Sequence, residues 1–171
     1  MNVREERSLV NYTFKKLSID DAHEAIEIFN YYITNTMSAY PENPVSDEFF
    51  HFFVDSSEGY PAYSIYDESR LIGFGLLRKY NFMSSFNKVA EITCFIHPEY
   101  TRQGIGGLLL RRLASEGKMM GLNSILASVS SKNEGSIRFH KKHEFIERGR
   151  FIGVGSKNGV EFDVVWLQKM L

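Results

Sequence analysis

The sequence predicts an α/β protein built on one mixed β-sheet, and two features indicate this fold class. A strand is expected over residues 89–96, a helix after the glycine-rich segment 102–107, and another strand over residues 124–129. A helix that connects two strands of one sheet makes them parallel. Residues 145–154 and 160–167 flank Lys157-Asn-Gly159, which predicts a final antiparallel hairpin. The sheet should therefore contain both kinds of pairing.

The first third of the chain predicts one strand and two helices. The strand is expected over residues 12–17. Ser18-Ile-Asp-Asp21 matches a capping box in which Asp replaces the usual Glu, and apolar residues recur at helical spacing over residues 22–34. A second, short helix is expected after Ser46, with three aromatic residues on one side: Phe49, Phe50 and Phe53.

The middle of the chain predicts a hairpin followed by an aromatic loop. Residues 62–66 and 71–77 read as strands around a turn, and the second strand is apolar on both faces, which is typical of a central strand. The loop 79–87 carries four large apolar side chains: Tyr80, Phe82, Met83 and Phe86. Such residues either fold over the core or contact a substrate or a second subunit, and both alternatives stay open.

The strand over residues 89–96 places a carboxylate among apolar residues. Glu91 is expected on the same face as Phe95, whereas Cys94 and Ile96 lie on the other face. A carboxylate is costly to bury without a partner. Glu91 is therefore either a salt-bridged or exposed residue at the strand end, or a general base beside a cleft.

Two helices and a strand complete the pattern. Leu108, Leu109, Leu113 and Met120 are expected to form the apolar face of a helix that ends near Gly121. After the strand 124–129, residues 133–142 predict another helix with three residues available to face inward: Ile137, Phe139 and His140.

Composition narrows the class of protein. The 171 residues carry a formal net charge of −1, so no overall field favours nucleic acid or an anionic membrane. No apolar run approaches the roughly 20 residues of a membrane span. The single cysteine, Cys94, fits a reducing compartment, and we expect it to be a core residue of a cytoplasmic protein. Residues 1–10 are polar and are expected to be flexible.

Several chemistries do not match the motifs. A dinucleotide fold would need a third glycine at Leu109, and a Walker loop would need Gly-Lys-Ser/Thr. His140 and His143 lie three apart with no Glu or Cys to complete a metal set, so no metal is expected. No Gly-x-Ser-x-Gly elbow is present for a hydrolase.

The segment Arg102-Gln-Gly-Ile-Gly-Gly107 suits a phosphate or pyrophosphate. Three glycines in four positions let the backbone approach a ligand closely. The N-terminus of the following helix adds unpaired N–H groups and a partial positive charge, and Arg102 adds a full one. Glycines that serve only a tight turn and packing would produce the same pattern.

These motifs together resemble the GNAT N-acetyltransferases. The segment 101–107, between a strand and an apolar helix, is similar to the family's acetyl-CoA-binding motif Gln/Arg-x-x-Gly-x-Gly/Ala, and residues 133–145 are similar to its next motif. Residues 28–36 and 154–168 resemble the phosphinothricin acetyltransferase-like branch. The resemblance implies one domain over residues 11–171 with a central, mostly antiparallel sheet, a splayed parallel strand pair and flanking helices.

The resemblance also implies how acetyl-CoA would be bound. The pantetheine arm would lie beside Cys94, Phe95 and Ile96 and bond main chain as an added strand. Asn133 and Ser136 belong to the motif of the next helix, from which Asn133 would reach the same arm. The pyrophosphate would be held by the backbone of six residues: Arg102, Gln103, Gly104, Ile105, Gly106 and Gly107.

For catalysis, the resemblance implies direct attack by a primary amine. Glu91 matches the proposed general base, which takes a proton from the substrate ammonium directly or through water. A strand N–H would stabilise the oxyanion. His140 occupies the place of a Tyr thought to protonate the departing thiolate; either this role or packing would explain it.

The expected acceptor is a small amino-acid-like amine. The loop Asn81-Phe-Met83 lacks the arginines expected in enzymes that act on phosphinothricin, so we expect an aromatic acceptor pocket from Tyr31, Tyr40, Phe82 and Phe86. Relatives in this branch are usually homodimers, which implies a homodimer here. Two alternatives stay open: transfer to protein N-termini or polyamines, and a non-catalytic acyl-CoA-binding module.

Overall fold

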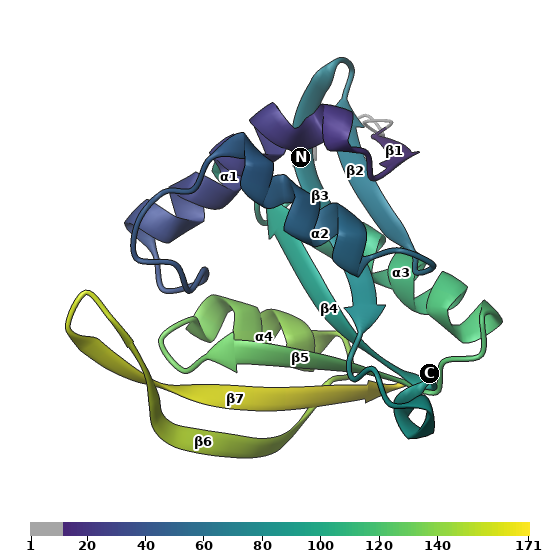
Figure 1. Cartoon of the computed structure of the whole chain (residues 1–171), viewed down its shortest axis with the longest axis vertical. Helices are drawn as coiled ribbons and strands as arrows, with labels where there is room; N and C mark the ends of the chain where they lie inside the picture. The colour runs from purple at the N-terminus through teal and green to yellow at the C-terminus, as the bar shows by residue number, and fades with distance from the viewer. Residues whose placement is uncertain (1–11) are drawn as a thin grey trace, which may run out of the picture.

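The computed structural model describes residues 12–171, and its single sheet has the strand order β1-β2-β3-β4-β5-β7-β6 (Figure 1). The segment 1–10, expected to be flexible, lies outside the described residues. The strands are β1 (Thr13–Lys16), β2 (Ala62–Asp67), β3 (Arg70–Lys79), β4 (Val89–Ile96), β5 (Ser124–Ser130), β6 (Ile146–Lys157) and β7 (Val160–Met170). The α-helices are α1 (Ala22–Asn35), α2 (Phe50–Ser56), α3 (Ile105–Met119) and α4 (Glu134–Lys142). Short 3₁₀ turns are η1 (Ile19–Asp21), η2 (Asp47–Phe49), η3 (Ser84–Phe86) and η4 (Pro98–Tyr100).

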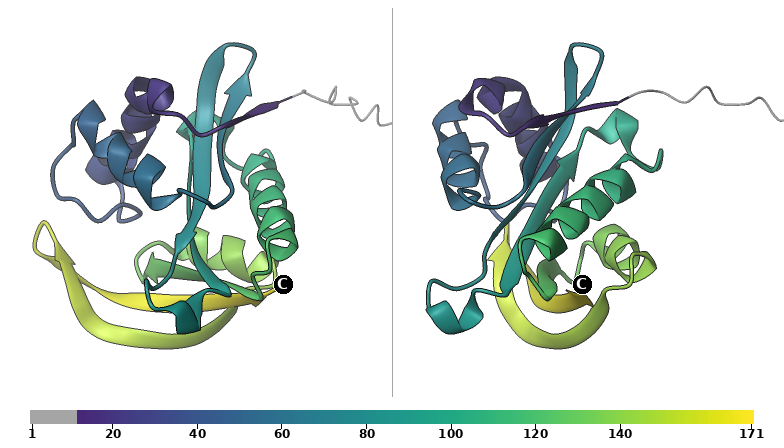
Figure 2. Two further views of the ribbon diagram at one scale, coloured as in Figure 1. Left: turned by 45° about the vertical axis from the view of Figure 1, so that its right-hand side comes forward. Right: turned by 90° about the vertical axis from the view of Figure 1, so that its right-hand side faces the viewer.

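The predicted mixed sheet is confirmed. Strands β4 and β5 pair in parallel, and all other neighbours pair antiparallel. Helix α3 connects the parallel pair, as a crossover between such strands requires. Helices α1 and α2 lie on one side of β2–β4 and α3 lies on the other (Figure 2).

Two apolar cores fill the two faces. On one face, Ile92 of β4 packs with Leu109 of α3. On the other, Phe74 of β3 packs with α1 and α2. Leu108 and Met120, expected on the apolar face of α3, are instead 43% and 46% exposed. The buried stripe follows Ile105, Leu109 and Leu113, and a neighbouring residue is rotated by about 100° around the helix.

Strands β4 and β5 diverge part-way along their length. Their register is Val89 with Ser124, Ala90 with Ile125 and Glu91 with Leu126, and within residues 12–171 the pairing ends there. Strand β4 nevertheless continues to Ile96 along β3, and β5 continues to Ser130 along β7. We call the point beyond Glu91 and Leu126 the fork. The splayed parallel pair expected from the sequence is therefore present.

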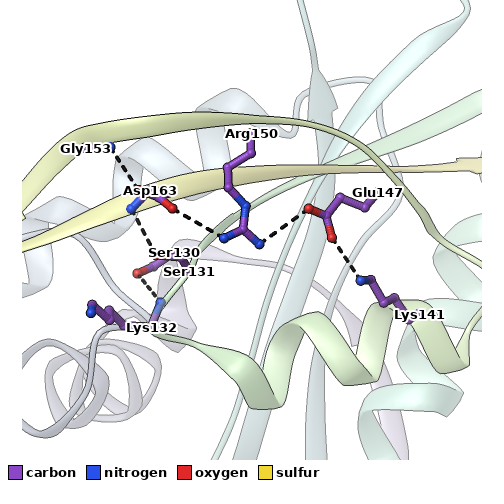
Figure 3. A network of polar contacts seen from close by, with 8 residues as sticks. All are labelled: Ser130, Ser131, Lys132, Lys141, Glu147, Arg150, Gly153 and Asp163. Atoms are coloured by element: carbon purple, nitrogen blue, oxygen red, sulfur yellow. Dashed lines mark hydrogen bonds and ion pairs between the residues drawn. The ribbon is translucent and has the colours of Figure 1, made fainter.

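The β6–β7 hairpin is longer than predicted and strongly curved (Figure 2). Strand β6 changes register between Phe151 and Gly155, and such bulges bend a strand. Gly153, at φ +62°, donates its N–H to Asp163 Oδ1 at 2.9 Å. Asp163 Oδ2 also pairs with Arg150 at 3.3 Å, so one carboxylate of β7 holds the bulged strand in place (Figure 3).

The start of α1 is tied to β2 through a buried carboxylate. The side chain of Asp21 completes the predicted capping box by accepting from Ser18 N–H at 3.1 Å. It also accepts from the hydroxyl groups of Ser64, at 2.5 Å, and Tyr66. Three donors from two elements therefore converge on one side chain.

Substituting Asp21→Ala should lower the free energy of unfolding by about 2–4 kcal/mol, because it leaves buried hydroxyl groups without an acceptor. Urea unfolding followed by the fluorescence of Trp166, the single tryptophan, measures this change. The matched control is Asp20→Ala, which removes an exposed carboxylate of the same turn and should change stability by at most about 1 kcal/mol. Equal losses in both variants would contradict the role of the buried network.

Candidate active site

The free edge of β4 beyond the fork offers main-chain groups to a ligand. His97 N–H donates to Ile72 O at 2.8 Å, so the backbone of His97 faces β3. Because pairing alternates along an antiparallel ladder, the backbone groups of Cys94 and Ile96 point away from β3, towards the fork. Phe95 faces β3 with its backbone and packs its ring against Phe29 with centroids 5.0 Å apart. Of the three residues expected beside pantetheine, Cys94 and Ile96 direct their main-chain N–H and C=O groups towards the fork, whereas Phe95 directs its own towards β3.

Tyr32, on α1, reaches this edge and was not expected from the sequence. Its hydroxyl donates to Ile96 O at 2.6 Å. Burial raises the pKa of Tyr32 to about 12, with the nearby Cys94 and Tyr31 adding to the effect, so the phenol stays protonated and can donate. Burial also raises the pKa of Cys94 to about 11, which leaves a thiol and not a nucleophilic thiolate at neutral pH.

The glycine-rich segment forms the start of α3 beside the end of β4. Arg102 and Gly104 have φ of +61° and +87°, so the chain turns twice through the left-handed region before the helix begins at Ile105. The first N–H groups of a helix have no carbonyl one turn earlier to bond, and with a preceding turn of this kind they form an anion-binding concavity. Arg102 is exposed beside them, and so is Gln103, whose side chain donates to Glu99 O.

The other two glycines, Gly106 and Gly107, lie against α4 and its C-cap. A Cβ on Gly107 would lie 2.9 Å from the His143 ring, and one on Gly106 would lie 3.4 Å from Phe139. The missing side chain of Gly107 therefore gives room to the ring of His143 at the end of α4, whereas a Cβ at Gly106 would make only an ordinary contact with Phe139. The packing explanation left open for the glycines is correct for Gly107, whereas Gly104 is needed for its backbone conformation.

Helix α4 carries the predicted residues Asn133, Ser136 and His140. Asn133 is its N-cap and accepts from Ser136 N–H at 3.1 Å, so the Asn133 amide N–H₂ is the part left for a ligand. His140 is 5% exposed, and its Nδ1 contacts Ser136 O at 2.8 Å. Because a carbonyl only accepts, Nδ1 carries the proton and Nε2 is an acceptor. Among the described residues Nε2 has no hydrogen-bond partner.

Glu91 lies at the fork with two polar partners. Its Oε1 accepts from Ser128 Oγ of β5 at 2.9 Å, and its Oε2 pairs with Arg78 of β3 at 3.0 Å. The Glu91 side chain is only 13% exposed, and the Arg78 guanidinium lies 5.6 Å from the Phe52 ring centroid. The salt bridge left open for Glu91 is therefore present, on the sheet face that α1 and α2 cover.

Tyr40 is the predicted acceptor residue that the fold brings to Glu91. Burial raises the pKa of its hydroxyl, Ser128 opposes this rise, and the negative charge of the Glu91 carboxylate adds to it. Its ring stacks on Phe162 of β7 with centroids 5.6 Å apart and planes 5° apart. Trp166, the cross-strand neighbour of Ser128, continues the same face of β7.

The other predicted acceptor residues lie in different places. Phe86 packs against Tyr80, which contacts Trp166, so this part of the aromatic loop adjoins the Glu91 end of β4. Phe82 is 79% exposed at the loop tip, so the loop does not fold over the core there. Tyr31 instead lines a cavity of about 370 Å³ beside His97. That cavity is six residues along β4 from Glu91, or about 20 Å, so the predicted four-residue pocket does not form within one chain.

Three residues of the site were missed at the level of sequence: Tyr32, Arg78 and Ser128. For Ser128 a signal existed, because Ser124, Ser128 and Ser130 share one face of a strand whose other face is apolar. Arg78 becomes a partner of Glu91 only through the β3–β4 register. Tyr32 lies on the inner side of α1, where the sequence pattern predicts only that an aromatic side chain packs in the core.

Other kinds of site are not seen. Within residues 12–171 no cluster of three or more His, Cys, Asp or Glu side chains is arranged to hold a metal ion. None of the helices in the same part of the chain has the length and apolar character to cross a membrane.

Comparison with known proteins agrees with this geometry. The chain is 24% identical over 153 residues to the L-amino acid N-acyltransferase MnaT of Escherichia coli, covering 88% of this chain and 89% of that protein. It is also 24% identical to the L-methionine sulfoximine/L-methionine sulfone acetyltransferase of Salmonella typhimurium, over 88% and 90% of the two chains. The structure of a GNAT superfamily phosphinothricin acetyltransferase from Sinorhizobium meliloti in complex with AcCoA superposes with a TM-score of 0.86 at 22% identity, over 94% and 88% of the chains.

The model of one protein family matches residues 25–145, the segment from α1 past the end of α4. This segment is well over half of the chain and includes the diverging strands and the glycine-started helix. The chain therefore belongs to the acetyltransferase (GNAT) family, which confirms the family predicted from its motifs.

Proposed function

We propose that this protein transfers the acetyl group of acetyl-CoA to the primary amine of a small amino-acid-like acceptor. The observation that carries the proposal is the fork, where a free main-chain edge, a glycine-started helix and the Glu91–Ser128 pair meet. The free edge suits an extended amide-containing arm, and the helix start suits its phosphates.

The residues on the α3 side fit acetyl-CoA. The N–H groups of Ile105, Gly106 and Gly107 at the start of α3 would bind the pyrophosphate, and Arg102 would add its charge. The main chain of Cys94 and Ile96 would bond the pantetheine amides, and the Asn133 amide would donate to the same arm. When bound, acetyl-CoA supplies an acetyl group activated as a thioester.

On the opposite face, Glu91 would prepare the acceptor amine. Its carboxylate would take the ammonium proton, directly or through the Ser128 hydroxyl that it already accepts from at 2.9 Å. The Arg78 guanidinium holds Oε2 in place, which leaves Oε1 as the oxygen that accepts from Ser128. The Tyr40 hydroxyl would contact the acceptor beside this oxygen.

Arg78 supports an amino-acid-like acceptor over a polyamine. A fixed cation next to the amine site attracts an acceptor carboxylate and repels a second ammonium. The names of the relatives agree, since they act on L-amino acids and on methionine sulfoximine or sulfone. Short peptides and polyamines are the competing acceptor classes.

The role of His140 depends on its protonation. Burial lowers its pKa, with the positive charge of His143 adding to the effect, and Nδ1 donates to Ser136. At neutral pH Nε2 would therefore accept a hydrogen bond, and it could protonate a thiolate only after gaining a second proton. That His140 acts as the general acid therefore stays a prediction, and it requires this second proton on the ring.

We also propose a homodimer in the cytoplasm. The homodimer is supported by the exposed apolar residues that gather on the curved hairpin: Phe151, Ile152, Val154 and Val160. A second copy would shield them from water. The cytoplasmic location rests on the single cysteine of the sequence.

Free thiol released from acetyl-CoA should increase when L-methionine sulfone or another amino-acid analogue is added. The panel should contain amino acids, phosphinothricin, polyamines and short peptides, with acetyl-CoA binding measured by calorimetry in parallel. Stimulation by polyamines alone would overturn the acceptor class. Binding without release by any amine would indicate an acyl-CoA-binding module.

The variant Glu91→Gln should lower kcat by about a hundredfold or more while acetyl-CoA affinity stays nearly unchanged, because only proton removal is lost. Steady-state kinetics and calorimetry measure the two quantities. Glu161→Gln, which neutralises an exposed carboxylate of β7, is the control. If Glu91→Gln weakens acetyl-CoA binding as much as it lowers the rate, Glu91 is a structural residue.

Stability should decrease as the pH falls below about 6.5, because the unfolded chain then binds a proton that buried His140 resists. Because the pKa of His140 is lower in the folded protein than in the unfolded chain, this stabilisation is complete above the pKa of the unfolded chain. It is lost as the pH falls through the pKa of the folded protein. His140→Gln should therefore flatten the fall in unfolding free energy between about pH 7 and pH 5. Exposed His51→Gln should leave the slope as in the wild type. Parallel slopes in all three proteins would rule out this effect of His140.

A further inference from the structure

Lys157, at the end of β6, is a buried cation outside the groups assigned so far. It is 2% exposed, and its Nζ donates to three backbone carbonyls: Ile33 O at 2.6 Å, Ala39 O at 2.8 Å and Thr36 O at 3.0 Å. These carbonyls belong to the last turn of α1 and the segment after it. The hairpin tip and this segment approach each other on the same side of the molecule (Figures 1 and 2).

The contact satisfies every donor of the ammonium. A lysine is rarely this buried unless its charge is compensated. The last carbonyls of a helix lack an intrahelical partner and carry a partial negative charge, so they suit a cation. Three N–H groups meet three carbonyls, which leaves Lys157 no donor for a substrate.

The hydrogen bonds of Lys157 also constrain the position of Tyr40. The Ala39 carbonyl belongs to the peptide unit that enters Tyr40, whose ring stacks on Phe162 of the same hairpin. Phe162 can lie there because Gly155 has no side chain: a Cβ at Gly155 would be 2.2 Å from the ring. Asn158 N–H, at the hairpin turn, also donates to Glu42 at 2.9 Å. The hairpin thus contacts residues 39–42 at three points.

We propose that Lys157 is a positioning residue of the acceptor site. Its contacts join the hairpin tip to the end of α1 and thereby fix Tyr40 near Ser128 and Glu91. The position of Tyr40 in turn determines one side of the acceptor site. The inference rests on the proposed function, because the site that it shapes is the acceptor site. Lys157 acts through Tyr40 and touches neither the acceptor nor acetyl-CoA.

The test compares Lys157→Met with Lys169→Met. Lys169 donates to His143 O at 3.2 Å and pairs with Glu144 near the other end of β7, so its substitution removes a lysine–carbonyl contact and an ion pair far from Tyr40. Amide hydrogen exchange of residues 36–42 is measured without any acceptor, together with acetyl-CoA affinity and the acceptor KM. Lys157→Met should speed exchange in this segment and raise the acceptor KM by about tenfold, with acetyl-CoA affinity unchanged. Lys169→Met should do neither.

A double-mutant cycle separates positioning from a general loss of structure. In a Tyr40→Ala background, Lys157→Met should lower the acceptor kcat/KM little further, because its effect passes through Tyr40. Full additivity would overturn the proposal, and so would unchanged exchange over residues 36–42. Lys157→Arg, which keeps the charge but cannot direct three N–H groups from one atom at the three carbonyls, provides the same exchange and acceptor-KM tests if Lys157→Met does not fold.

Failure of the proposed function gives a different result. If no amine releases thiol with the wild-type protein, the transferase assignment fails, while hydrogen exchange still reports whether Lys157 holds residues 36–42. If the wild type is active and Lys157→Met has an unchanged acceptor KM, the positioning role alone fails.

Discussion

The divergence of β4 and β5 is the constraint on which the rest of the site depends. Two parallel strands that separate leave main-chain donors and acceptors without a ladder, and such groups need other partners. Tyr32 satisfies one of them by donating to Ile96 O. The others, at Cys94 and Ile96, lie on the unpaired side of β4 beyond Glu91, which itself accepts from Ser128. In the proposed function the backbone itself would therefore provide one binding edge, and side chains would complete its two ends.

The fork also separates the two halves of the proposed reaction by sheet face. The residues that would bind acetyl-CoA come from α3, α4 and the edge of β4, whereas Glu91, Arg78 and Tyr40 lie on the α1 and α2 side. The alternation of side chains along β4 produces this separation. Glu91 directly follows Ala90 in the strand, so the carboxylate and the apolar core residue point to opposite faces of the sheet.

Two partly or fully buried cations lie near the proposed acceptor site and differ in their partners. Arg78 pairs with a carboxylate and remains partly open to solvent, so it retains donors for a ligand. Lys157 is enclosed by three carbonyls and serves only to join two segments that are distant in sequence. At 22% identity the fold still superposes on a phosphinothricin acetyltransferase with a TM-score of 0.86. Such a likeness shows the backbone arrangement alone.

The sequence by itself determined the features that depend on local pattern. Alternation, capping residues and glycine spacing are short-range properties, so they predicted the strand 89–96, the glycine-started helix, the parallel pair and the family. Tertiary structure alone decided which distant residues meet. Arg78 reaches Glu91 through the β3–β4 register, and Tyr31 lines a cavity beside His97, away from Glu91. Lys157 finds its carbonyls across more than a hundred residues. These contacts depend on strand register, helix rotation and the curvature of a bulged hairpin, which arise only when the whole sheet has formed.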